Sequence, residues 1–114
     1  MKKILTVVML CFTMNAQAQF ISGNKLVLLM REYEKASRDV PNTSYGDAGR
    51  FQGYVAGVHD AFGGVAFCTP PRATNGQVEQ VVVRYINAHP ARWAEPANLL
   101  VLNALNQAFP CGKQ

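Results

Sequence analysis

The chain has 114 residues, of which 49% are hydrophobic and 16% charged, with a formal net charge of +4. This length allows one modest hydrophobic core. Lys2 and Lys3 lie in the N-terminal segment, and the other basic residues are scattered rather than gathered in runs. The charge pattern therefore gives no support to nucleic-acid binding.

The first 18 residues have the features of a Sec-type signal peptide. An apolar segment covers residues 4–14, and Ala16-Gln17-Ala18 presents small residues at the positions that a signal peptidase reads. The segment is too short to cross a bilayer core, which needs roughly 20 residues, so we expect cleavage rather than a membrane anchor. Cys11 lies inside the segment and lacks the small preceding residue of a lipidated cysteine. The predicted product is one periplasmic domain, residues 19–114.

The first predicted helix covers residues 22–37. Its apolar residues recur at spacings of three and four, as on one face of a helix. They are Leu26, Leu29, Met30 and Tyr33. Ser22 or Asn24 can cap its N-terminus. Pro41 then breaks the helical pattern.

The second predicted helix, residues 46–66, is expected to be central. Its apolar stripe consists of Phe51, Tyr54, Val55, Val58, Phe62 and Val65. Small residues also recur at every fourth position, namely Gly49, Gly53, Gly57 and Ala61. Each glycine costs a helix about 0.5–1 kcal/mol relative to alanine. We therefore expect this ridge to let another helix approach closely, so that the second helix packs on two sides and frays or ends at Gly63-Gly64.

Two further helices complete the prediction. The third begins at Thr74-Asn75-Gly76-Gln77, which fits a capping box, and stops at His89-Pro90. The fourth begins near Glu95-Pro96 and runs to about Phe109. The stripe of the third is Val78, Val81, Val82, Tyr85 and Ile86, and that of the fourth is Leu99, Leu102, Leu105 and Phe109, widened by Leu100, Val101 and Ala108. The sequence predicts an all-α, compact bundle of about four helices.

Cys68 and Cys111 are the two cysteines that remain after removal of the leader. In an exported domain of this size a pair of cysteines most simply forms a disulfide. Closing a loop of about 44 residues would contribute roughly 4 kcal/mol. A reactive thiol or a metal ligand is the alternative, and an oxidising compartment disfavours it.

The residue patterns of known enzymes and metal sites are missing from the sequence. His59 and His89 are the only histidines, and neither has the spacing to another ligand that zinc sites use. No Gly-x-Ser-x-Gly, phosphate-binding loop or paired-carboxylate pattern occurs. We therefore expect no catalytic residues, no metal, no cofactor and no enzymatic activity.

Two pairs of residues are candidates for binding a partner protein. Arg92 and Trp93 lie in a linker flanked by prolines, and these residue types often anchor interfaces, although aromatic residues also fill small cores. His59 and Asp60 are neighbours in the second helix, where a local or an interfacial hydrogen bond is expected.

Several motifs together resemble a known family. They are Gly53-Tyr54-Val55-Ala56-Gly57-Val58-His59-Asp60-Ala61, Phe67-Cys68-Thr69-Pro70, Tyr85-Ile86 with His89-Pro90, and Ala108-Phe109-Pro110-Cys111. Over about residues 46–111 the chain resembles the Rap/Tai immunity proteins, which protect bacteria from type VI secreted amidases. The resemblance implies a periplasmic all-helical protein with an intramolecular disulfide, often acting as a dimer. It also implies that the protein binds a peptidoglycan amidase with a papain-like cysteine site and blocks that site.

A periplasmic helical chaperone, similar to the acid-stress chaperones, is the alternative hypothesis. Such proteins are also small and disulfide-bonded. They need many carboxylates, however, and this chain has only seven Asp and Glu residues. The composition therefore favours an immunity protein over a chaperone.

Overall fold

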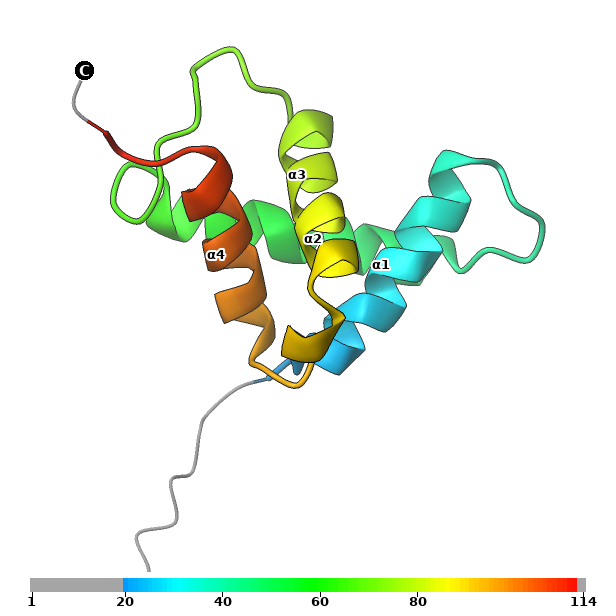
Figure 1. Cartoon of the computed structure of the whole chain (residues 1–114). Coiled ribbons are helices and arrows are strands. Elements are labelled where there is room, and N and C mark those ends of the chain that lie inside the picture. Colours follow the sequence, from blue (N-terminus) through cyan, green and yellow to red (C-terminus); the bar gives the residue numbers. More distant parts are fainter. Residues whose placement is uncertain (1–19, 113–114) are drawn as a thin grey trace, which may run out of the picture.

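Four α-helices and one short 3₁₀ helix make up the described part of the chain (Figure 1). The computed structural model describes residues 20–112, so the predicted signal peptide lies outside the described residues. The helices are, in chain order, α1 (Gly23–Ser37), α2 (Tyr45–Phe62), α3 (Asn75–Ala88), the 3₁₀ helix η1 (Pro90–Arg92) and α4 (Ala97–Ala108). The predicted all-α fold and the predicted order of the helices are confirmed.

Helix α2 is the base on which the other helices are assembled. It contacts each of the other three α-helices, and in Figure 1 they lie in front of it. Helix α3 also packs on α4, and α4 reaches α1. The central position predicted for α2 is therefore confirmed.

One cluster of buried apolar side chains lies between the helices. Phe51 and Val55 of α2 and Leu26 and Met30 of α1 are at most 1% exposed. The ring of Tyr33 packs on that of Phe51, with the ring centroids 5.0 Å apart. Fully burying a side chain of this size is worth about 1.5–3 kcal/mol. The apolar face of α1 thus lies in the core, as its periodicity predicts.

The glycine-rich face of α2 is exposed, contrary to the prediction. Gly49, Gly53 and Gly57 face solvent, and a Cβ added at any of them would meet no atom within 4 Å. All three packed helices lie on the apolar face of α2, so the expected close approach to the ridge is wrong among the described residues. Val65 is also misassigned, because α2 ends at Phe62 and leaves Val65 83% exposed.

Polar side chains cap the N-termini of α1, α2 and α3. Ser22 accepts a hydrogen bond from the backbone of Lys25 at 3.1 Å, and Ser44 caps α2 in the same way. At α3 the predicted capping box is present. The Thr74 hydroxyl accepts from the Gln77 amide at 3.2 Å, and the Gln77 side chain accepts from the Thr74 amide at 2.9 Å. Each cap is worth about 1 kcal/mol.

The buried face of α4 agrees with the predicted stripe in part. Leu105 is buried as predicted, and so are Leu100 and Val101, which widen the stripe in the prediction. Leu102 and Phe109 are partly buried against the core. Leu99 is 42% exposed, however, and Ala108 is exposed as well. The prediction is therefore wrong at these two positions.

The predicted disulfide between Cys68 and Cys111 is present. It joins the connector after α2 to the segment after α4, with the two Cα atoms 4.9 Å apart. The backbone amide of Cys68 donates to the carbonyl of Phe109 at 2.8 Å, and the Asn106 side chain donates to the carbonyl of Ala66 at 2.7 Å. The connector is therefore held to α4 and to the segment after it by one covalent bond and two hydrogen bonds.

The start of α1 docks against the turn that precedes α4. The amide of Gly23 donates to the carbonyl of Glu95 at 2.8 Å, and the amide of Ala97 donates to that of Ile21 at 3.2 Å. A Cβ at position 23 would overlap the carbonyl oxygens of Trp93 and Glu95. The close approach therefore requires glycine at this position.

Candidate functional site

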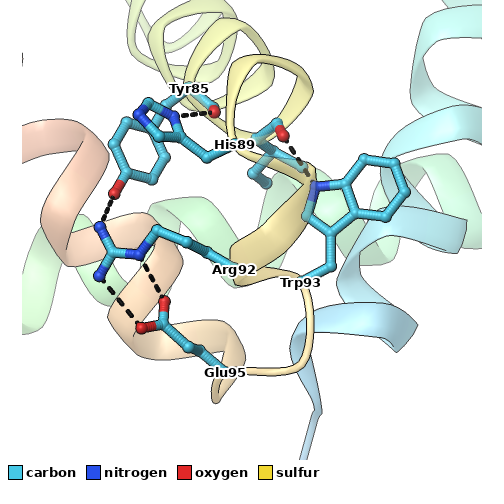
Figure 2. A network of polar contacts seen from close by, with 6 residues as sticks. Tyr85, His89, Arg92, Trp93 and Glu95 are labelled. Carbon is cyan, nitrogen blue, oxygen red and sulfur yellow. Dashed lines mark hydrogen bonds and ion pairs between the residues drawn. The ribbon is translucent and has the colours of Figure 1, made fainter.

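Arg92 and Trp93 lie between α3 and α4, in the segment that we call the Trp93 turn (residues 89–96). Figure 2 shows that Arg92 points at Glu95 and at the hydroxyl of Tyr85. Its Nε lies 2.9 Å from one carboxylate oxygen of Glu95, and its Nη2 lies 3.1 Å from the other. The Glu95 carboxylate is the main cause that raises the pKa of Arg92 above its ordinary value. Three nitrogens of this guanidinium are therefore occupied by residues near in sequence.

Trp93 braces the same turn. Its indole N–H donates to the carbonyl of Ile86 at 2.8 Å (Figure 2). The half-buried ring packs against the core, and the guanidinium carbon of Arg31 lies 5.6 Å from the ring centroid. Trp93 therefore contributes to the hydrophobic core, although it lies in the turn between α3 and α4.

His89 closes the end of α3. Its ring stacks on that of Tyr85, with the centroids 4.1 Å apart, and its Nδ1 lies 2.7 Å from the Tyr85 carbonyl oxygen. A carbonyl only accepts hydrogen bonds, so Nδ1 carries the proton. This contact satisfies one of the free carbonyls at the helix C-terminus.

His59 and Asp60 lie in the last turn of α2. The Nε2 of His59 is 2.8 Å from the hydroxyl oxygen of Thr69, which is the local hydrogen bond that the sequence led us to expect. The side chain of Asp60 is 86% exposed, and its carboxylate lies 3.7 Å from Nδ1 of His59. Among residues 20–112, no side-chain hydrogen bond or ion pair joins this pair to the Trp93 turn.

Glu79 is a buried acidic residue that the sequence did not reveal. It is 7% exposed and lines a cavity of about 140 Å³ between α2 and α3, beside His59 and Asp60. The Gln52 side chain donates to its carboxylate at 3.5 Å. Burial, and after it the Glu79 carboxylate, raises the pKa of Tyr33. In the sequence, Glu79 follows Val78 and lies four residues before Val83, and both valines are buried. This position next to the apolar face of α3 was the only sign that Glu79 would be buried.

A larger, open groove of about 960 Å³ lies beside the first turns of α3. We call it the arginine groove and define it by Tyr33, Pro70, Arg72, Gln80, Arg84 and Phe109. These residues come from α1, the connector, α3 and the segment after α4. The sequence could not predict the groove, because only the folded connector and the disulfide bring these segments together. The one available signal was the isolation of Arg72 and Arg84 from acidic neighbours along the chain.

Two other kinds of feature, a metal site and a membrane-spanning helix, were sought in the described residues. Within residues 20–112, no three His, Cys, Asp or Glu side chains are grouped so that they could hold a metal ion. None of the helices in that range combines the length and the hydropathy that crossing a membrane requires.

The fold and these surfaces define a small, all-α, disulfide-bonded protein. A family model for Rap1a immunity proteins matches residues 22–111, a range that includes all four α-helices and both bridged cysteines. The chain therefore belongs to the Rap1a immunity protein family. This match confirms the resemblance to the Rap/Tai proteins. A comparison with curated proteins finds no match.

Proposed function

We propose that this chain is a periplasmic immunity protein that binds a type VI secreted peptidoglycan amidase and occludes its active site. The observation that carries the proposal is the match to the Rap1a immunity family over residues 22–111. The signal peptide predicted for residues 1–18 supports export, because a toxin that cuts peptidoglycan must be stopped in the periplasm.

In this proposal the protein is a binding protein rather than an enzyme. The reactive thiol belongs to the papain-like site of the amidase, whereas Cys68 and Cys111 are joined to each other. Occlusion needs no chemistry from the inhibitor. It needs a rigid surface that keeps substrate away from the nucleophile.

We propose His59, Asp60, Arg92 and Trp93 as contact residues for the amidase. The side chain of Asp60 is 86% exposed and can pair with a partner, whereas Arg92 is 39% exposed and offers its remaining surface while it stays paired with Glu95. Alanine at Asp60 is the cleanest single test, because its removal breaks only a contact of 3.7 Å to His59. We expect weaker binding of the amidase and an unchanged melting temperature.

We also propose that the protein forms a homodimer, as the family resemblance implies. Sedimentation equilibrium of the leaderless protein at micromolar concentration tests this. A mass of one chain at every concentration would contradict the dimer and leave the immunity function open.

The immunity function is tested by protection of a sensitive cell. Cells would produce a type VI amidase in the periplasm together with the full chain, with a chain lacking residues 2–18, or with residues 19–114 behind an unrelated Sec leader. We expect protection from the two exported forms and lysis with the leaderless form. An amidase whose catalytic cysteine is replaced by alanine controls for toxicity.

Two outcomes decide against the proposal. Lysis in the presence of the exported protein, together with no complex between the purified protein and any amidase of a type VI panel, removes the immunity function. Protection by the leaderless form would contradict the periplasmic site of action and leave the immunity function standing.

A further inference from the structure

The arginine groove combines apolar walls with a basic rim. Tyr33 and Phe109 contribute aromatic rings, and the side chain of Gln80 donates to the Tyr33 hydroxyl at 3.5 Å. Its volume of about 960 Å³ is near the upper end of ordinary ligand sites, which span roughly 300–1,000 Å³. An open groove of this size fits a segment of polypeptide with several side chains.

The charges of the groove are unmatched within the described protein. Arg72 and Arg84 are exposed, and neither joins an ion pair or a side-chain hydrogen bond among residues 20–112. No Asp or Glu of the same residues lines the groove. By contrast, Arg92 is paired with Glu95. The two free guanidinium groups therefore favour a ligand that carries carboxylates.

The walls of the groove are held in place before any ligand arrives. The disulfide fixes the connector that carries Pro70 to the segment that carries Phe109. The capping box of Thr74 and Gln77 fixes the first turn of α3. A surface ordered in this way loses little conformational entropy when it binds.

We propose that the arginine groove is the docking site for an acidic segment of the amidase. Carboxylates of that segment pair with Arg72 and Arg84, and an apolar side chain between them packs on Tyr33 and Phe109. A peptide carries both kinds of group on one chain, whereas a free inorganic anion would leave the apolar walls uncovered. The inference rests on the proposed immunity function, and it names the chemistry that the amidase presents.

Three variants test the docking site. Arg72→Glu with Arg84→Glu reverses the charge of the rim. Gly76→Phe fills the groove without changing its charge, and there is room for this side chain because a Cβ at Gly76 would meet only the Thr74 hydroxyl, at 4.0 Å. The matched control is Lys25→Glu with Arg38→Glu, which makes the same change in charge at exposed positions of α1 and its C-terminal cap.

The measurement is the Kd for purified type VI amidases, by calorimetry at low and high salt. The panel is first screened with the unaltered leaderless protein. For the amidase that binds, we expect Kd to rise at least about tenfold in the charge-reversed variant and in Gly76→Phe, and by less than about twofold in the control. Higher salt should weaken the unaltered complex more than the charge-reversed one. Circular dichroism should give the same melting temperature for the unaltered protein and the two groove variants. The control should melt slightly lower, because Arg38→Glu removes the hydrogen bond to the Glu34 carbonyl at the C-terminus of α1.

The possible outcomes distinguish an error in the docking site from an error in the proposed immunity function. If the unaltered protein binds an amidase and the groove variants bind it equally well, the docking site is wrong and the immunity function stands. If the unaltered protein binds no amidase of the panel, the proposed function fails and the docking site fails with it.

Discussion

The Trp93 turn and the arginine groove both present arginine and aromatic side chains, yet they use them in opposite ways. In the turn, Arg92 is engaged by Glu95 and Tyr85, and the Trp93 indole by the carbonyl of Ile86. In the groove, Arg72 and Arg84 have no such partners among the described residues. Residue type alone therefore does not separate a brace from a binding surface. The two are distinguished by whether their polar groups already have hydrogen-bond partners within the protein.

The largest expected effect concerns the disulfide, which supports the groove rather than the turn. Replacing Cys68 and Cys111 together by serine should lower the free energy of unfolding by about 4 kcal/mol, because the bridge no longer restricts the unfolded chain. Urea denaturation measures this loss, and the unaltered protein treated with reductant is the matched control. Equal stability of the oxidised and reduced proteins would contradict the prediction.

The next effect tests how tightly the turn is docked. Gly23→Ala should lower the free energy of unfolding by about 2–3 kcal/mol, since a Cβ there overlaps two backbone carbonyl oxygens of the turn. Backbone atoms cannot move aside as the tip of a flexible side chain can. An unchanged urea midpoint would mean that α1 does not rest on the turn.

Trp93 should matter for stability whether or not a partner contacts it. Because the ring is half-buried, Trp93→Ala should cost about 2 kcal/mol, less than a fully buried tryptophan. Trp93→Phe should cost about 1 kcal/mol, because the Ile86 carbonyl loses the indole donor and keeps only the His89 amide at 3.2 Å. If both variants melt like the unaltered protein, Trp93 is a surface residue and the contrast with the groove disappears.

The exposed face of α2 offers a stabilising change. Gly53→Ala should raise the free energy of unfolding by about 0.5–1 kcal/mol, because the helix gains and no atom lies within 4 Å of the new Cβ. It is the opposite of Gly23→Ala, although both glycines lie in helices. A loss of stability would indicate a packing partner on this face, and sedimentation of the variant would then show whether that partner is a second copy.

The smallest effects compare arginines directly. Arg92→Ala should lower the melting temperature by a few degrees, since it leaves Glu95 and the Tyr85 hydroxyl without their donor. Arg72→Ala and Arg84→Ala should leave it unchanged, because neither side chain has a bonded partner among residues 20–112. Equal shifts for all three would remove the distinction between the two regions.

Local signals in the sequence were enough for the helices and the disulfide. Hydrophobic periodicity located α1 and α3, and Thr74 with Gln77 marked the start of α3 because a capping box depends only on neighbouring residues. The cysteine pair followed from export and composition.

Features that depend on the relative rotation of helices were not predicted. The glycines of α2 could have faced another helix or solvent, and only the packing of three helices on the opposite side decided between them. The exposure of Leu99 in α4 was missed for the same reason, because Leu99 and Leu100 are both apolar and tertiary packing buries only Leu100. The arginine groove needs four separate segments at once, which no local pattern contains.

The position of the disulfide also separates the formation of the helices from the bond that joins their ends. All four α-helices end by Ala108, yet the bridge needs Cys111, three residues further along the chain. A product that stops after Pro110 would contain every helix and every wall of the groove but would lack the covalent ring that joins them. Such a truncated chain would keep its helical sequences but lose the restraint that the bridge places on the unfolded state, so it should be less stable and more open to proteolysis than the bridged protein.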